Sequence, residues 1–231
     1  HMDRPLYDRH GRVHPFCHAV RGAWHVMGVT QGAGLSLQWF RNQLAPGVEY
    51  DQLTAEAATA PCGSQGLFWL PYLMGERTPH LDAAARGGWI GLTAKHKRAD
   101  VVRALLEGVS YSQKDCLDVI EQMGVPVESV RVSGGGARSP FWRQLLADVF
   151  AKKVVTLETQ EGSAYGAALL GMVGTGAFAS VQEACRAAIR ETDSVKPRPH
   201  ESQLYQRGHE VYRSLYPILK PVYGLIQNLG R

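Results

Sequence analysis

The chain has 231 residues, 45% of them hydrophobic, and a formal net charge of +4 with histidine neutral. Its charges are spread without a basic block, which argues against nucleic acid as a partner, although mild basicity suits an anionic ligand. No apolar run approaches the ~20 residues that a membrane helix needs, so no membrane partner is expected. Four cysteines without a Cys-x-x-Cys pair favour reduced thiols, and hence a cytoplasmic protein, over a disulfide scaffold.

Hydrophobic periodicity predicts a hairpin that leads into two helices and a loop in the first half of the chain. His1 and Met2 are interpreted as a remnant of cloning, and residues 1–12 as this remnant plus a linker. Asp51 is a suitable N-cap for the second helix. The expected elements are strands at 12–20 and 24–30, helices at 34–44 and 51–58, a buried strand or extended loop at 67–73, and a loop at 75–88.

The second half of the chain alternates strands with helices. Apolar spacing describes a long amphipathic helix with Asp100 near its start and Gly124 at its end. In the tail, Pro217 and Pro221 interrupt a helical pattern, which predicts a kinked helix or two short ones. The expected elements are helix 99–123, strand 129–133, helix 141–151, strand 153–157, helix 162–173 and the tail 203–229. This alternation predicts an α/β fold with a mixed or parallel sheet and helices on both faces.

A run of three glycines between a strand and a helix is the most informative local feature. Gly134, Gly135 and Gly136 remove every Cβ from the turn, so that a flat ligand or a phosphate can approach the backbone N–H groups closely. Ser139 can cap the following helix and Pro140 suits its first turn. The turn either binds such a ligand or only lets the strand and helix pack closely. The pattern is neither Gly-x-Gly-x-x-Gly nor a P-loop, so Rossmann and Walker chemistry are unsupported.

Three other features also allow more than one interpretation. The small-residue helix at 162–173 suits close approach to a ligand, but tight packing against a neighbour is favoured. The loop Gly75–His80 could place Glu76 and Arg77 in a cleft, form an internal salt bridge or make a dimer contact, and a cleft-lining structural role is favoured. A metal site is disfavoured for His14, Cys17, His18 and His25, because alternation along the strands directs them to different faces.

In order and spacing, several motifs resemble the C-terminal half of the FGGY family of carbohydrate kinases, most closely its xylulokinases. The resemblance covers residues 13–223. Its most specific parts are the Gly-Glu-Arg-Thr-Pro-His loop and the Gly-Gly-Gly-Ala-Arg-Ser turn. The motifs are Gly75-Glu76-Arg77-Thr78-Pro79-His80, Gly88-Trp89-Ile90-Gly91-Leu92, Glu107-Gly108-Val109, Gly134–Ser139 and Gly162–Ala168.

The resemblance implies an RNase H-like domain of the actin-like ATPase fold, with residues 13–200 as the nucleotide-binding domain and 201–231 as a helical tail. It also implies ATP and Mg²⁺ as cofactors, with most Mg²⁺ ligands outside this chain, and a ketopentose such as D-xylulose as acceptor. In the family, the catalytic aspartate and most sugar contacts belong to an N-terminal half that this sequence lacks. The chain is therefore expected to be inactive alone, and Asp115, Asp118 and Asp148 are not expected to act as the base.

The family's binding roles transfer to positions in the glycine turn and in the first helix. Two turn glycines would lie against adenine and ribose, and Gly34 and Gln38, one helical turn apart, would face the nucleotide. Arg138 could stack on adenine, contact phosphate or be an ordinary surface residue. Tyr50 could form the other wall of the base slot, or only staple the short helix behind it. The expected nucleotide-binding residues are Gly34, Gln38, Gly134, Gly135, Gly136, Ala137, Arg138 and Ser139.

The resemblance also implies that the first strand of the sheet is missing. The gap would leave an unpaired edge in the middle of the sheet, and it is expected to be filled by residues 2–12, by a neighbouring chain or by a rearranged edge. A homo-oligomer is therefore expected. Two hypotheses follow: the ATP-binding part of a xylulokinase-like enzyme, or a non-catalytic module that binds nucleotide or associates with itself.

Overall fold

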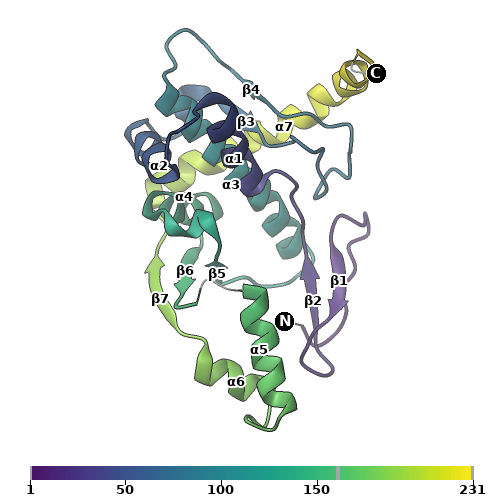
Figure 1. Ribbon diagram of the computed structural model, residues 1–231. Helices are drawn as coiled ribbons and strands as arrows, with labels where there is room; N and C mark the ends of the chain where they lie inside the picture. Colours follow the sequence, from purple (N-terminus) through teal and green to yellow (C-terminus); the bar gives the residue numbers. More distant parts are fainter. Residues whose placement is uncertain (1, 160–161, 230–231) are drawn as a thin grey trace.

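The computed structural model describes residues 2–159 and 162–229, which form helices around three small sheets (Figure 1). The first half contains β1 (His14–Cys17), β2 (Trp24–Met27), α1 (Ala33–Leu44), α2 (Tyr50–Thr59), the 3₁₀ turn η1 (Ser64–Gly66), β3 (Phe68–Leu70), β4 (Gly88–Ile90) and α3 (Arg98–Gln122). The second half contains β5 (Ser129–Val132), the 3₁₀ turn η2 (Gly135–Arg138), α4 (Pro140–Phe150), β6 (Lys153–Leu157), α5 (Gly162–Gly174), α6 (Val181–Ala188), β7 (Glu191–Val195) and α7 (Pro199–Leu229).

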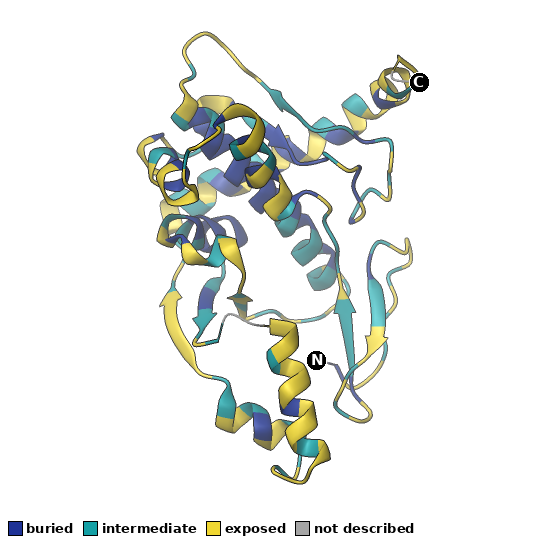
Figure 2. Cartoon of the chain, in the orientation of Figure 1, coloured by how far each residue is buried: buried dark blue, intermediate teal, exposed yellow. Residues whose placement is uncertain are grey.

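Helix α3 is the centre of the hydrophobic core. It packs against α1, α2, α4, α7 and β3, and its middle turns are buried almost all round (Figure 2). The helix begins where the Asp100 carboxylate accepts the backbone N–H of Lys97 at 2.9 Å. Gly108 lets β3 cross closely, because a Cβ there would lie 2.0 Å from the carbonyl oxygen of Trp69. The glycine of the Glu-Gly-Val motif is therefore required for packing.

The sheet nearest the glycine turn is mixed, as predicted. β5 pairs with β6 in parallel, and β6 pairs with β7 antiparallel. The β1–β2 hairpin is a separate sheet, and β5 has no partner on its other side within the described part of the chain. Beside the hairpin, Met2 and Trp24 exchange two backbone hydrogen bonds of 2.8 and 2.7 Å. One residue of the 2–12 segment thus pairs with the edge of β2 that β1 leaves open.

The predicted element boundaries hold for most helices and fail for the hairpin. β1 and β2 have four residues each and are much shorter than expected, because the chain beyond Met27 leaves β2 to hydrogen-bond to the loop at 76–78. The strand expected at 67–73 shortens to Phe68–Leu70 and pairs with β4, which the sequence did not predict. α6 and β7 were also unpredicted. β7 is formed by Glu191–Val195, whose polar residues give no apolar alternation.

Of the two alternatives predicted for the tail, two short helices are wrong, because α7 is one helix that includes both prolines. A kink at the prolines stays a prediction. Pro217 and Pro221 lie four residues apart on the exposed side, where water can satisfy the carbonyl groups that lose their N–H partners. The opposite side buries Tyr205, Tyr212, Tyr216 and Tyr223 in the same core as α3. The boundaries at residues 12 and 200 remain predictions.

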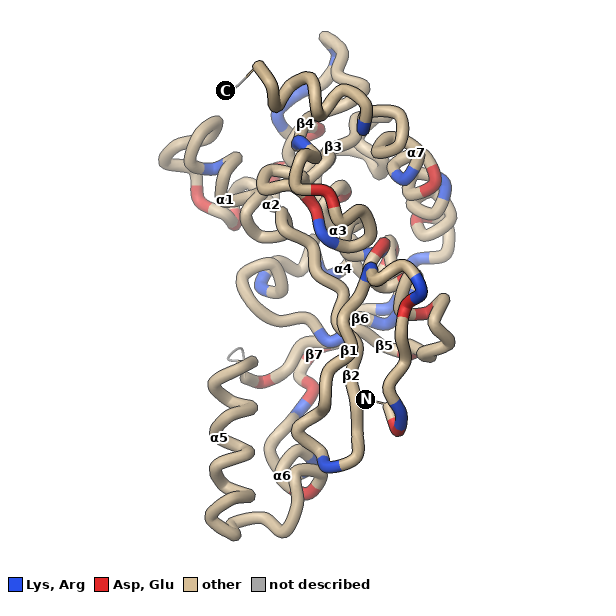
Figure 3. Tube along the Cα trace, turned by 90° about the vertical axis from the view of Figure 1, so that its right-hand side faces the viewer, with Lys and Arg blue, Asp and Glu red and all other residues tan. Residues whose placement is uncertain are grey.

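Tight packing was favoured for the small-residue helix, and the structure contradicts this. Within α5, Leu169 alone among its described residues is buried, and a Cβ added at Gly162, Gly166 or Gly171 would meet nothing within 4 Å. Figure 2 shows α5 as largely exposed, and Figure 3 shows that it carries no Lys, Arg, Asp or Glu. An apolar, uncharged helix thus lies uncovered beside the β5 sheet.

Candidate nucleotide-binding site

A cleft of about 520 Å³ separates the glycine turn from α1 and the start of α2. Six of the eight predicted nucleotide-binding residues line it: Gly34, Gln38, Gly135, Gly136, Arg138 and Ser139. The other two, Gly134 and Ala137, line a cavity of about 450 Å³ on the opposite side of the turn, toward the ends of β5 and β6. The structure therefore brings two segments about 100 positions apart in sequence to one cleft.

The backbone of the turn explains why glycine is used there. Gly134 has φ +78° and ψ −171°, a conformation that other residues rarely adopt. A Cβ at Gly135 would meet nothing within 4 Å, so this glycine leaves open space at the cleft. The predicted cap is confirmed, because the Ser139 hydroxyl accepts the backbone N–H of Trp142 at 3.3 Å and Pro140 is the first residue of α4.

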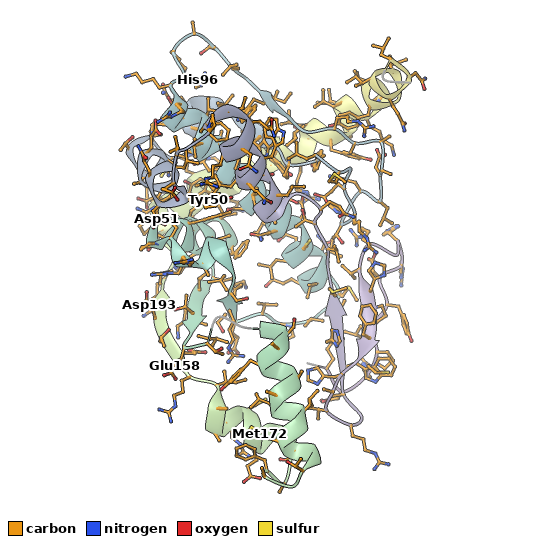
Figure 4. The ribbon with its side chains drawn as sticks, viewed as in Figure 1. Tyr50, Asp51, His96, Glu158, Met172 and Asp193 are labelled. Atoms are coloured by element: carbon orange, nitrogen blue, oxygen red, sulfur yellow. The ribbon has the colours of Figure 1, made fainter. Side chains whose placement is uncertain are left out.

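The opposite wall of the cleft comes from α1 and α2. Gly34 and Gln38 are exposed on the side of α1 that faces the cleft. Tyr50, the first residue of α2, lines the same cleft, and Figure 4 shows it with Asp51 in the space between α2 and α4. The Arg41 guanidinium lies 4.8 Å from the centre of the Tyr50 ring and holds this ring at the mouth of the cleft.

The cleft has acidic side chains on its α2 wall and a basic side chain on the wall formed by the glycine turn. Glu49 and Asp51 place carboxylates beside α2, and Arg138 lies across from them on the turn. Carboxylates repel phosphate but accept hydrogen bonds from sugar hydroxyl or amino groups. A nucleotide in this cleft would therefore place its base and ribose near α2.

Several residues that line the cleft were not among the nucleotide-binding residues predicted from the sequence. These are Leu37, Glu49, Asp51, Thr54 and Trp142. Leu37 and Trp142 are buried residues of α1 and α4, and local spacing does not show which end of an apolar face opens on a cleft. The only signal for Trp142 was its place three residues after the capping serine.

The Gly75–His80 loop is fastened to the chain that follows β2. The buried Glu76 carboxylate accepts hydrogen bonds from the Thr30 hydroxyl, the Gln31 N–H, the Arg77 N–H and the Ser112 hydroxyl at 2.8–3.1 Å. Burial raises the pKa of Glu76, and these four donors oppose that effect. The Arg77 guanidinium contacts His14 instead, and this loop does not line the 520 Å³ cleft among the residues that the structure describes. Its observed role is to hold two loops together.

The remaining candidate groups are engaged in structural contacts. His18 and His25 pack edge to face at 5.8 Å, and in residues 2–159 and 162–229 no three His, Cys, Asp or Glu side chains are placed to hold a metal ion. The three aspartates considered above are each paired: Asp115 with His209 at 2.8 Å, Asp118 with Lys114 and Asp148 with Arg198 at 2.6 Å.

Comparisons with known proteins agree with this architecture. The C-terminal domain of the FGGY family of carbohydrate kinases matches residues 2–175. The xylulose kinase of Bacillus subtilis (strain 168) is 38% identical over 209 residues, covering 90% of this chain and 42% of that protein. The gluconokinase of the same strain is 35% identical over 242 residues, covering 98% of this chain and 45% of that protein. The crystal structure of ligand-bound xylulose kinase from Lactobacillus acidophilus superposes with a TM-score of 0.89 and 28% identity, covering 97% of this chain and 46% of that one.

The fold and its neighbours define an RNase H-like α/β domain of the actin-like ATPase class. The chain belongs to the FGGY family of carbohydrate kinases, as a C-terminal domain, and it spans less than half the length of the relatives that it matches. Among the described residues, no helix is both long and apolar enough to span a bilayer.

Proposed function

We propose that the cleft between α1, α2 and the glycine turn binds the adenine and ribose of ATP. The observation that carries this proposal is the convergence of Gly34 and Gln38 with Gly135, Gly136 and Ser139 on one cleft. The bare backbone at Gly135 suits the close approach of a flat base, and the carboxylates beside α2 suit the hydroxyl groups of the ribose.

The complete protein, on this proposal, is a xylulokinase-like enzyme that transfers the γ-phosphate of ATP to D-xylulose and forms D-xylulose 5-phosphate. Such a transfer depends on in-line positioning and on a carboxylate that accepts the proton of the attacking hydroxyl. Mg²⁺, when bound, would neutralise charge on the transferred phosphate. This chain supplies the nucleotide site and one side of a closing cleft. The paired states of Asp115, Asp118 and Asp148 support the view that the base comes from outside this chain.

The relatives of this chain include kinases that are named for two different sugars. The gluconokinase of Bacillus subtilis is almost as similar to this chain as the xylulose kinases are. The preference for a ketopentose rests on the motifs of the sequence. It is tested by comparing D-xylulose with D-gluconate as acceptors for the assembled protein.

Calorimetry of this chain with ADP, followed by a coupled kinase assay, tests the function. We expect ADP to bind, no turnover by the chain alone, and turnover when the N-terminal half of a family member is added in trans. A chain that fails to bind ADP, or that phosphorylates sugar unaided, would contradict the proposal. Gly135→Leu, which fills the open space at the turn, serves as the negative control for binding.

Self-association is the second function that a specific observation favours. The uncharged α5 is exposed over most of its length, and β5 has no partner strand on one side within the described residues. Both features are typical of surfaces that another polypeptide covers. We propose that the isolated chain is a cytoplasmic homo-oligomer that buries this surface.

A further inference from the structure

Trp142, in the first turn of α4, packs against the glycine turn. A Cβ at Gly136 would lie 3.0 Å from Cζ3 and 3.1 Å from Cε3 of the Trp142 ring, so the ring lies beside the Gly136 backbone and leaves no free space for a side chain there. The ring is 6% exposed and lines the nucleotide cleft on one side. It also lines an adjoining cavity of about 490 Å³ between α3, α4, β5 and the glycine turn, which shares Gly34, Gly135 and Gly136 with the cleft.

The ring packs in the hydrophobic core and makes one hydrogen bond to α3. The indole Nε1–H of Trp142 donates to the hydroxyl oxygen of Ser110 at 3.3 Å, and Ser110 is fully buried. The Ser110 hydroxyl donates its own proton to the carbonyl oxygen of Leu106 at 2.7 Å, which leaves its lone pairs to accept from the indole. The cavity beside the ring means that packing alone does not hold it on that side, so the hydrogen bond sets its orientation.

The same helix turn fastens the rest of the glycine turn. The Arg143 guanidinium donates to the carbonyl oxygen of Ala137 at 2.8 Å, and the Arg143 N–H donates to the carbonyl oxygen of Ser139 at 3.0 Å. The backbone of the turn is thus supported at Ala137 and Ser139 by Arg143, and at Gly136 by Trp142. Of these supports, the Trp142 ring is the one that depends on a residue of another helix.

We propose that Ser110 and Trp142 are positioning residues for the nucleotide. Together they set the position of the Gly136 backbone at the wall of the cleft. This inference rests on the proposed function, since it assigns the device that shapes the same site. Its consequence is that loss of the Ser110 hydroxyl lets the ring move toward the adjoining cavity. The Gly136 backbone then loses its support, and nucleotide binding weakens although Ser110 is not among the described residues that line the cleft.

The chain provides a closely matched control. Trp69 Nε1–H donates to the Ser36 hydroxyl oxygen at 3.2 Å, and Ser36 is also fully buried and donates to a carbonyl four residues earlier, that of Gly32. Trp69 packs on Trp89 with ring centres 4.2 Å apart and is not among the described residues that line the nucleotide cleft. Ser36→Ala therefore removes the same type of hydrogen bond, at a similar expected cost in stability, without releasing the glycine turn.

The test compares Ser110→Ala with Ser36→Ala in ADP calorimetry and in amide hydrogen exchange without nucleotide. We expect Ser110→Ala to weaken ADP binding about tenfold and to speed exchange at residues 135–138. Ser36→Ala should leave both unchanged. Trp142→Phe in the Ser110→Ala background leaves no orphaned donor, so it should recover part of the affinity and should abolish the ADP-dependent change in tryptophan fluorescence.

The outcomes separate this inference from the function on which it rests. If the unaltered chain binds no ADP, the proposed nucleotide site is wrong and this inference is overturned with it. If the unaltered chain binds ADP but Ser110→Ala binds equally well and exchanges like Ser36→Ala, the nucleotide site stands and the positioning role is refuted. A variant that unfolds is replaced by Ser110→Cys, which keeps the size and weakens the acceptor.

Discussion

Replacing Glu107 should be among the most destabilising single changes in this chain, because it removes the anion of a buried network. The Glu107 carboxylate is 2% exposed and accepts hydrogen bonds from Arg103 Nε at 2.8 Å, the Tyr205 hydroxyl at 2.9 Å, the Ser64 hydroxyl at 2.8 Å and the Gly63 N–H at 2.9 Å. The Arg103 guanidinium also donates to the Ala60 carbonyl oxygen and the Tyr205 hydroxyl. The network joins α3, η1 and α7.

The expected cost of Glu107→Ala follows from what it leaves behind. Arg103 is 4% exposed and would remain charged, because a guanidinium does not lose its proton in proteins. Removing one partner of a buried ion pair costs about 3–5 kcal/mol, a large part of the stability of an ordinary domain. We expect unfolding of the chain in guanidinium chloride to show this loss as a lower midpoint concentration, with little change in the dependence of the unfolding free energy on denaturant.

Two controls make the measurement specific. Glu56→Ala breaks an exposed pair with Arg98 and should leave the midpoint nearly unchanged. Arg103→Met in the Glu107→Ala background removes the orphaned cation and should recover part of the loss. A cost below about 1 kcal/mol for Glu107→Ala would refute the reasoning, because it would mean that water or a rearranged side chain satisfies Arg103.

Three further predictions concern pH, the glycine turn and α5. Burial lowers the pKa of His80 to about 4, so between pH 6.5 and 4 the His80 side chain takes up a proton more readily in the unfolded chain than in the folded one. The free energy of unfolding should therefore fall by about 1–2 kcal/mol as the pH falls through this window. In pH-dependent melting, His80→Gln should reduce this slope and the exposed His200→Gln should not; equal slopes in all three proteins would exclude His80 as the cause. Gly136→Ala should lower both the melting temperature and ADP affinity, because its Cβ meets Trp142, whereas Gly135→Ala should lower affinity alone, and equal melting losses would contradict the geometry. Leu170→Glu on exposed α5 should convert an oligomer to a 25.4 kDa monomer in light scattering, unlike Gln206→Glu on α7, and an unchanged mass would remove α5 from the interface.

Much of the local structure was predictable because its signals are local. The limits of α1, α3 and α4 follow from apolar periodicity and end residues, and the Ser139 cap follows from the order serine, proline and apolar run. The cap predicted for α2 is wrong, because Asp51 lies in its first turn and Glu49 is at the N-cap position. β7 was missed because a polar edge strand carries little periodic signal. α6 was missed although Ser180 caps it, with its hydroxyl accepting the Glu183 N–H at 3.2 Å. The prolines of α7 left two short helices as an alternative, because the tyrosines that keep the helix in the core are a tertiary contribution.

The sequence by itself determined the glycine turn, the helix that follows it and six residues that share one cleft. These features were predictable because backbone conformation and family motifs depend on short stretches of residues. Only the tertiary structure decided that Trp142 supports Gly136, that Ser110 holds Trp142, and that Glu76 ties two loops together. Such contacts join residues that are distant along the chain, and their geometry depends on how α3 packs against its neighbours. The exposure of α5 was likewise decided at this level, because a stripe of small residues is compatible with a covered surface and with a bare one.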